Sequence, residues 1–211
     1  MKDRLRAGDL ILDREFDDLL PAHISQLSSA YWTPIVVAVA AAAFLTEGRP
    51  SARLLDVGCG PGKFCAIAAA STGAHCHGVD RSEELVRVAR DVAERLGLST
   101  AHFQVGDALR LDWQEFDGFY FYNPFSELIP DITRPSDSVR TSYGYFAHSV
   151  RAATEKLYLM PVGTRVVTFH GIGGQLPGSY KLVGHSVVSA GDLRFYVRGA
   201  GADADGPASA C

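Results

Sequence analysis

Three glycines at alternate positions follow a short apolar run in LLDVGCGPGKF, residues 54–64. They are Gly58, Gly60 and Gly62, and glycine lacks the Cβ atom that would hold a ligand away from the main chain. Asp56 lies two residues before the first glycine, at the expected end of a strand, where it offers a fixed hydrogen-bond acceptor. The stretch therefore predicts a strand, a tight glycine turn and a helix start, with a ligand lying against the backbone of the turn.

Two further acids follow the next two expected strands. Asp80 ends HCHGVD, residues 75–80, and Asp107 follows the expected strand 101–105. The carboxyl ends of parallel strands meet at one edge of an open α/β sheet, and an acid at the end of the second strand commonly accepts hydrogen bonds from ribose hydroxyls. Asp80 could instead cap the helix that follows, but Ser82 is the better cap, which leaves Asp80 for a ligand.

The pattern D-x-G-x-G-x-G over residues 56–62 resembles motif I of the class I S-adenosylmethionine-dependent methyltransferases. The dinucleotide fingerprint of nicotinamide-dependent oxidoreductases needs G-x-G-x-x-G, and the spacing G-C-G-P-G departs from it. The resemblance implies that the loop holds the methionine half of S-adenosylmethionine and that Asp80 binds its ribose. A glycine turn in another kind of α/β protein is the plainer interpretation of the loop taken alone.

The same resemblance implies a larger set of cofactor-binding residues. Arg81 would flank the adenine, Asp107 would accept a hydrogen bond from its exocyclic amine, and the Ala108 amide would meet a ring nitrogen. Thr33 precedes motif I, where many members of the family cover the cofactor, and its neighbour Trp32 could instead be a hydrophobic staple. The expected cofactor-binding residues are Thr33, Asp56, Gly58, Cys59, Gly60, Asp80, Arg81, Gly106, Asp107, Ala108 and Asn123.

The segment FDGFYFYNPF, residues 116–125, predicts a fourth strand that ends in Asn-Pro-Phe. This corner resembles the N-P-P-Y signature of amine-methylating members of the family, with phenylalanine in the place of the second proline. Asn123 is therefore expected to orient the methyl acceptor, and Tyr122, Glu127 or His170 could take up its proton. The catalytic candidates are Asn123, Glu127 and His170, and the alternatives are a plain Asn-Pro turn and a structural histidine.

The expected elements alternate as in an α/β domain. Helices are predicted over 10–20, 34–45, 63–71, 82–97 and 146–157, with Thr33 as the N-cap of the second. Strands are predicted before the glycine turn and over 75–80, 101–105, 116–122, 164–169, 180–189 and 193–197. These elements predict a Rossmann-like three-layer α/β/α sandwich, with a mostly parallel seven-stranded sheet and an antiparallel closing hairpin turning at 190–192.

The predicted organisation is one domain: a helical cap at 1–49, a methyltransferase core at 50–198 with a lid at 130–141, and a flexible tail at 199–211. A chain of 211 residues with 47% hydrophobic and 21% charged residues can bury one core of ordinary size. The net charge of −4 gives no basic footprint, so a nucleic-acid partner is not expected.

The cysteines and the apolar runs indicate where the protein works. The four cysteines form no C-x-x-C pair and have no histidine at ligand spacing, so neither a metal site nor a disulfide framework is expected. The amino-terminal residues lack the pattern of a signal peptide. The longest apolar run, residues 35–45, is about half the length that a membrane span needs. A cytoplasmic protein with no membrane partner is therefore expected, in an oligomeric state that the sequence leaves open.

The sequence thus predicts an S-adenosylmethionine-dependent methyltransferase that modifies a nucleophile, with nitrogen favoured, of a small molecule or a protein or peptide. A catalytically silent cofactor-binding protein or partner subunit would carry the same glycine loop. A nicotinamide-dependent oxidoreductase is the second alternative, against which the spacing of the glycines argues.

Overall fold

The computed structural model describes residues 1–128, 142–188 and 191–200. The lid predicted at 130–141 lies outside this part of the chain, as do residues 201–211 of the predicted tail. The α-helices are α1 Lys2–Ala7, α2 Asp13–Asp17, α3 Ala22–Ser25, α4 Ser28–Tyr31, α5 Ile35–Thr46, α6 Lys63–Thr72, α7 Glu83–Arg95 and α8 Tyr143–Tyr158. Short 3₁₀-helices are η1 Ala108–Arg110, η2 Trp113–Glu115 and η3 Ser126–Leu128.

Seven strands form one sheet, in the order β3-β2-β1-β4-β5-β7-β6. The pairs among β1 to β5 are parallel, whereas β7 runs antiparallel to both β5 and β6. This confirms the predicted fold class. The strands are β1 Arg53–Val57, β2 His75–Asp80, β3 Ala101–Val105, β4 Gly118–Tyr122, β5 Arg165–Phe169, β6 Tyr180–Val188 and β7 Gly191–Arg198.

The strand order reverses between β1 and β4, which places a crevice at their carboxyl ends. From β1 the chain moves outward through α6 to β2 and through α7 to β3, and it then returns to the other side of β1. The glycine turn after β1 therefore lies beside the end of β4, where the Asn-Pro-Phe corner begins.

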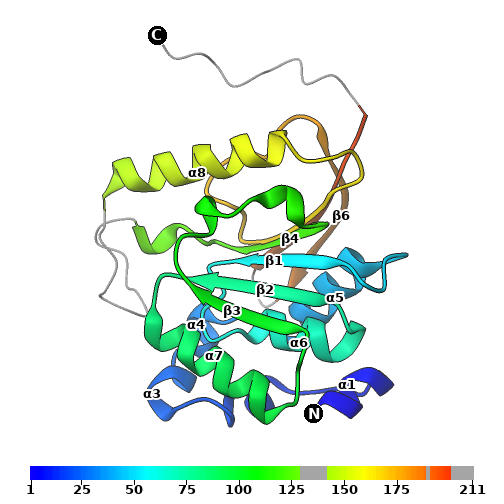
Figure 1. The fold of residues 1–211 in the computed structure, drawn as a ribbon, viewed down its shortest axis with the longest axis vertical. Coiled ribbons are helices and arrows are strands. Elements are labelled where there is room, and N and C mark those ends of the chain that lie inside the picture. Colours follow the sequence, from blue (N-terminus) through cyan, green and yellow to red (C-terminus); the bar gives the residue numbers. More distant parts are fainter. Residues whose placement is uncertain (129–141, 189–190, 201–211) are drawn as a thin grey trace.

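Two apolar cores lie on opposite faces of the sheet, because successive side chains of a strand point to opposite sides. On one face Leu54 and Tyr120 pack with residues of α5, α6 and α7. On the other face Leu55 and Phe119 pack with Leu157 of α8. Figure 1 shows the resulting layers, with α8 on one side of the strands and α6 and α7 on the other. These layers hold the strand ends in fixed positions.

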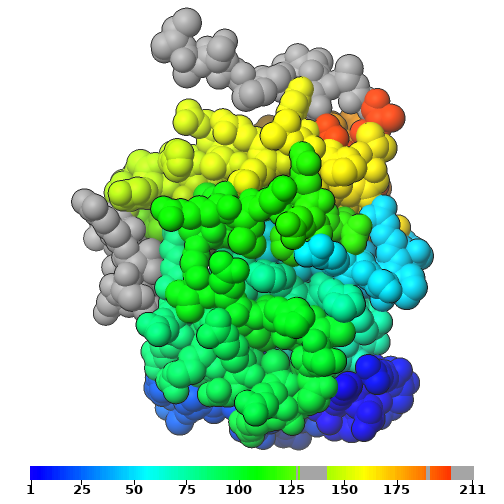
Figure 2. All heavy atoms as spheres, viewed as in Figure 1, coloured from blue at the N-terminus to red at the C-terminus, as the bar shows by residue number. Residues whose placement is uncertain are grey.

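The helix predicted over 10–20 was wrong in its extent. The helix α2 covers Asp13–Asp17 only, and Leu10, which the periodic pattern placed on a buried helical face, is 79% exposed. Short helices α2, α3 and α4 carry the chain instead, and their apolar side chains Phe16 and Ile24 are buried in the core shared with α6. The amino-terminal residues, in blue, lie along the lower rim of the face shown in Figure 2.

The N-cap of α5 also differs from the prediction. Thr33 does not cap this helix; the Ile35 amide donates instead to Oδ1 of Asp13, at 2.9 Å. The Thr33 hydroxyl lies 3.0 Å from the hydroxyl of Tyr120 on β4. A contact between segments far apart in the chain has thus replaced the local cap.

The closing hairpin is antiparallel as predicted, but β7 begins earlier than expected. Gly191 and Asp192, assigned to the turn, belong to β7 and pair with Val188 and Val187. A register shift lies between Leu182 and Gly184 on β6.

One helical segment, Ser28–Thr46, is long and apolar enough to span a membrane by length and composition, with a hydropathy of 1.6. In this fold 44% of that stretch is buried. Buried helices of soluble proteins pass the same test, so the observation is weak evidence for a membrane span.

Candidate functional site

The glycine loop joins β1 to α6 with three left-handed residues. Gly58, Gly60 and Gly62 have φ angles of 78°, 54° and 79°, a region that favours glycine. At Gly60 the need is also spatial, because a Cβ there would lie 2.9 Å from Cζ3 of Trp32. The loop amides already have partners: those of Gly58 and Cys59 donate to the Val79 carbonyl at 2.9 and 3.1 Å. The loop thus offers a surface without Cβ atoms rather than a row of free donors.

Asp56 lies beneath the loop and is 3% exposed. Its Oδ2 atom accepts a hydrogen bond from the Cys65 thiol at 3.6 Å. The pKa of Asp56 is raised to about 8, mainly by burial and also by the nearby charge of Asp80, although the hydrogen bond from Cys65 lowers it. The side chain borders a small cavity together with Thr33 and Cys59, so three of the predicted cofactor-binding residues meet there.

Asp80 occupies the end of β2 and is 9% exposed. Its Oδ2 accepts from the Gly60 amide at 2.9 Å, and its Oδ1 accepts from the Ser82 amide at 2.8 Å. Burial raises its pKa, against backbone hydrogen bonds from Ser82, Gly60 and Arg81 and the charge of Arg81, which lower it. The expectation that Ser82 would leave Asp80 free was therefore incomplete, because Asp80 also fixes the shape of the glycine loop. A carboxylate has about four acceptor sites, so the backbone bonds to Asp80 do not occupy all of them.

Asp107 follows β3, as predicted. Its Oδ2 pairs with Nη2 of Arg81 at 3.1 Å, and its Oδ1 accepts from the Leu109 amide at 3.0 Å. The Ala108 carbonyl accepts from the indole of Trp113 at 2.9 Å, and its amide lies on the same turn as Asp107. The Gly106 amide donates to the Asp80 backbone carbonyl at 2.8 Å, which ties the end of β3 to the end of β2.

Three narrow cavities run along this edge of the sheet and share walls. Asp107 and Arg81 border the first, which meets the second at Gly58, Asp80 and Pro124. The second, of about 70 Å³, meets the third at Gly58, Gly60, Tyr31, Trp32 and Tyr122. The third contains Asp56 and Thr33. The structure thus brings every predicted cofactor-binding residue to one edge, with Asn123 in the central cavity.

The Asn-Pro-Phe corner places its three residues differently. Asn123 lines the central cavity with a left-handed backbone at φ 43°. Pro124 packs on the glycine loop, so that a Cβ at Gly58 would lie 3.4 Å from the Pro124 Cβ. Phe125 is 4% exposed and lines the cavity of Asp107 rather than the central one. Among these three residues, Asn123 and Pro124 reach the central cavity, where the acceptor is expected.

The two other catalytic candidates have less direct positions. His170 is exposed, has φ 60°, and does not line the three cavities. Its ring stacks on Tyr122, which does line two of them, with 5.6 Å between the ring centroids. Glu127 lies in η3, and its side chain is outside the described part of the structure.

Three residues of the site were missed from the sequence. Phe64 and Tyr120 line the cavity of Asp56, and their rings stack 4.0 Å apart. Lys63 lines the same cavity and is 2% exposed. Its position directly after the third glycine was a signal for proximity to the loop, but the pattern carried no sign that its ammonium group would be buried.

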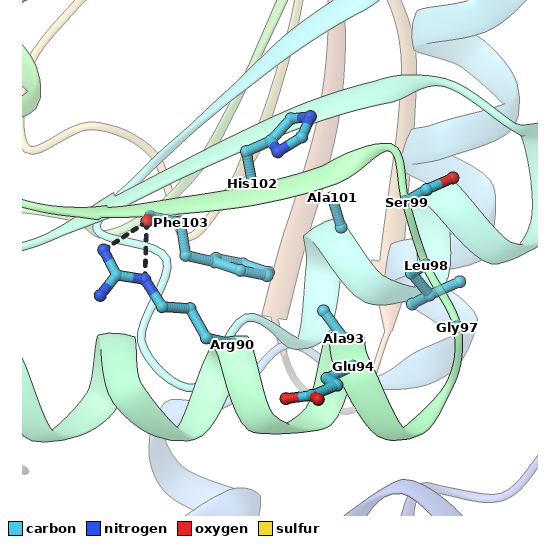
Figure 3. Close-up of a pocket in the computed structure, with 9 residues that line it drawn as sticks. All are labelled: Arg90, Ala93, Glu94, Gly97, Leu98, Ser99, Ala101, His102 and Phe103. Carbon is cyan, nitrogen blue, oxygen red and sulfur yellow. Dashed lines mark hydrogen bonds between the residues drawn. The ribbon is translucent and has the colours of Figure 1, made fainter.

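A larger hollow lies elsewhere. It has a volume of about 560 Å³ and lies between α7 and β3, away from the glycine loop. Figure 3 shows Arg90 of α7 reaching β3, where its Nε and Nη2 atoms donate to the Phe103 carbonyl at 3.1 and 2.8 Å. This is a shallow groove at an edge strand, and none of the predicted site residues lines it.

Comparisons with known proteins point to methyl transfer. Residues 49–132 match the family model described as a methyltransferase domain. Over 63 residues the chain is 40% identical to norajmaline N-methyltransferase of Rauvolfia serpentina, a match covering 29% of this chain and 22% of that protein. Over 114 residues it is 32% identical to 23S rRNA (uracil(1939)-C(5))-methyltransferase RlmD of Thiobacillus denitrificans, covering 54% and 25%. These matches span about a quarter of the length of the curated relatives.

The fold is shared over a longer stretch. An RNA methyltransferase from Salinibacter ruber, solved in complex with S-adenosyl-L-homocysteine, superposes with a TM-score of 0.60 at 20% identity. The match covers 82% of this chain and 97% of that one. The chain thus carries a segment similar to a methyltransferase domain, on a fold that it shares with a methyltransferase solved with S-adenosyl-L-homocysteine.

Proposed function

We propose that the chain binds S-adenosylmethionine along the carboxyl ends of β1, β2 and β3 and transfers its methyl group to a nucleophile. The observation that carries the proposal is the row of three adjoining cavities, which the glycine loop, Asp80 and Asp107 border in turn. An adenine, a ribose and an amino-acid chain, joined end to end, need this sequence of environments.

The residues present fit this cofactor. The methionine half would lie beside the glycine loop, in the cavities that Gly58 and Gly60 border together with Trp32. Asp80 has acceptor sites left for ribose hydroxyls. Asp107, with its carboxylate paired to Arg81, would accept from the adenine amine at the far end of the line.

The remaining residues would align the acceptor and exclude water. S-adenosylmethionine supplies an electrophilic methyl group on its sulfonium when it is bound. Tyr31, Trp32 and Tyr122 surround the central cavity with aromatic side chains, and Asn123 offers an amide that orients a nucleophile there. Holding the nucleophile, the carbon and the sulfur in line lowers the barrier mainly by removing translational and rotational freedom. His170, stacked on Tyr122, would pass a released proton to solvent.

We favour a nitrogen nucleophile on a small molecule or a peptide. Asn123 at the strand end supports nitrogen, since an amide oxygen accepts hydrogen bonds from an amine. The similarity to norajmaline N-methyltransferase supports it further. An RNA acceptor is the competing possibility, suggested by the similarity to an rRNA methyltransferase. The net charge of −4 favours the smaller acceptors.

Calorimetric titration tests the cofactor. We expect S-adenosylmethionine and S-adenosylhomocysteine to bind with a stoichiometry of about one per chain, as one line of cavities implies, and NAD to give no heat of binding. Binding of NAD alone would reject the proposal in favour of an oxidoreductase.

A methyl-labelling assay distinguishes an enzyme from a silent cofactor-binding protein. Panels of amines, peptides and RNA transcripts are incubated with the protein and a methyl-labelled donor. Label in the amine or peptide panel supports the proposed acceptor, whereas label in RNA alone would replace it. A protein that binds the donor and labels no panel would be a silent binder or a partner subunit.

A further inference from the structure

A buried ammonium group beside the glycine loop contacts the amino-terminal segment. Lys63, the first residue of α6, directly follows Gly62, and its side chain is 2% exposed. Its Nζ atom lies 2.7 Å from Oδ1 of Asp13 and 3.1 Å from Oδ1 of Asp17, and it is 3.3 Å from the Ser28 hydroxyl. A buried ammonium group needs such partners, because an isolated charge is costly to remove from water.

Each partner of Lys63 also fixes another part of the segment. Asp13 accepts the Ile35 amide at 2.9 Å and so begins α5. Asp17 accepts the Ser28 hydroxyl at 2.7 Å, which holds the start of α4. The Lys63 ammonium group also lies 5.5 Å from the centroid of the Phe16 ring, within range of a cation–π contact. The contacts of Lys63 therefore hold the stretch from α2 to the start of α5 in place beside the glycine loop.

That stretch ends in the aromatic wall of the site. Trp32 follows α4, is 6% exposed and lies over Gly60, while its indole nitrogen donates to the Ile24 carbonyl at 2.9 Å. Tyr31 and Trp32 line both the central cavity and that of Asp56. A shift of α4 would therefore move the surface that faces the cofactor and the acceptor.

We propose that Lys63 is a positioning residue, which holds Tyr31 and Trp32 over the glycine loop through Asp13, Asp17 and Ser28. This role rests on the proposed function, because the wall it places is that of the proposed methyl-transfer site. Lys63 acts through these contacts, and its side chain takes no part in the chemical step.

The double variant Asp13→Asn/Asp17→Asn tests this role. Asparagine keeps an oxygen that can accept from Ile35 and Ser28, so the variant mainly removes the two charges opposite Lys63. Asp18→Asn is the matched control, since Asp18 is exposed and adjacent in sequence. We expect the double variant to raise the Kd for S-adenosylhomocysteine about tenfold, within the range usual for coupling between neighbouring sites. The control should bind as the wild type does.

A charge rescue separates positioning from general loss of structure. Lys63→Met alone leaves the two carboxylates without their cation, whereas Lys63→Met/Asp13→Asn/Asp17→Asn removes both sides of the cluster. Lys63 is buried and Asp17 is 20% exposed, so breaking this pair costs more than replacing it entirely. The triple variant should therefore bind more tightly than either partial variant. If the loss of affinity in the triple variant equalled the sum of the losses in Lys63→Met and in Asp13→Asn/Asp17→Asn, the proposed role of this contact would be contradicted.

Hydrogen exchange of the unliganded protein gives a readout that does not depend on the cofactor. We expect faster amide exchange over residues 13–33 in the double variant, with exchange in α7 unchanged. The inference about Lys63 would be overturned if the double variant and the wild type exchanged at the same rate. It would also be overturned if the wild type bound S-adenosylhomocysteine and the double variant bound it equally well. Failure of the wild type to bind any adenosyl ligand would instead overturn the proposed function, and exchange alone would then decide the role of Lys63.

Discussion

At Gly60 the site depends directly on the absence of a side chain. Its φ angle is 54°, and a Cβ would lie 2.9 Å from Cζ3 of Trp32 and 3.1 Å from Cε3. The indole cannot retreat freely, because its nitrogen is bonded to the Ile24 carbonyl. The contact therefore links the backbone of the loop to the aromatic wall that covers it.

We expect Gly60→Ala to lower the free energy of unfolding by about 1–3 kcal/mol, since overpacking adds to the strain of a left-handed alanine. The affinity for S-adenosylmethionine should fall as well. Gly97→Ala is the control: its φ is 62°, and a Cβ there meets nothing within 4 Å. Urea unfolding and calorimetry of the two variants then separate strain from collision. Equal losses in both variants would show that Trp32 adds nothing.

Asp56 predicts an unusual pH dependence of stability. Burial raises its pKa in the folded protein to about 8, from a usual value of 3.8. Between these two values the folded state binds more protons than the unfolded state, so this group makes the protein less stable as the pH rises. The effect begins above the unfolded pKa and is complete above about pH 8.

Asp56→Asn removes this dependence. We expect the stability of the variant relative to the wild type to increase from about pH 5 to pH 8, by on the order of 2–5 kcal/mol, because one pKa unit corresponds to about 1.4 kcal/mol. Denaturant unfolding across that range measures it. Asp91→Asn removes an exposed acid of α7 and serves as the charge control. A difference between the Asp56 variant and the wild type that stays flat with pH would mean that Asp56 is ionised throughout.

At the scale of elements, a buried hydrogen bond helps to join the amino-terminal segment to the sheet. The Thr33 hydroxyl, just before α5, lies 3.0 Å from the hydroxyl of Tyr120, which is 1% exposed on β4. Burial raises the pKa of Tyr120, and the bond to Thr33 lowers it. The pair is thus a buried polar contact between segments 87 residues apart in sequence.

We expect Thr33→Val to lower the free energy of unfolding by about 1–3 kcal/mol, since it leaves the Tyr120 hydroxyl buried without this partner. Thr33→Val/Tyr120→Phe removes both hydroxyls and should recover most of that loss. Thermal unfolding of the single and double variants gives the coupling between them. Strictly additive effects would show that the two hydroxyls do not interact in solution.

These contacts mark the limit of what the sequence could predict. The strand ends and α7 were predictable, because hydrophobic periodicity, Ser82 and the glycines act over a few residues. The cap of α5 was not. Thr33 has a suitable side chain close to the start of the helix. The Ile35 amide nevertheless donates to Asp13, which lies 22 residues before Ile35. The partners of Lys63 were hidden for the same reason, since the pairing depends on how α2 folds back onto α6.

At the scale of the whole molecule, the site belongs to two parts of the chain. The strands and the turns that follow them supply Asp56, Asp80 and Asp107, and the amino-terminal segment supplies Tyr31 and Trp32. Further contacts fasten that segment elsewhere: Lys2 donates to the Gly97 carbonyl at 2.8 Å, and His23 lies 2.9 Å from Glu84 of α7. Both are exposed and contribute little stability individually, so the buried contacts near the loop must hold the segment.

A ligand that touches both parts should stabilise both. S-adenosylhomocysteine at a hundredfold excess over its Kd should add about 2.7 kcal/mol to the free energy of unfolding. For a domain of this size that corresponds to a rise in Tm of roughly 5–10 °C. Hydrogen exchange should slow over residues 13–33 as well as over the glycine loop, because Trp32 covers Gly60. Protection confined to residues 53–108 would mean that the amino-terminal segment does not contact the bound cofactor. Tyr31 and Trp32 would then lie beside the glycine loop only in the unliganded protein.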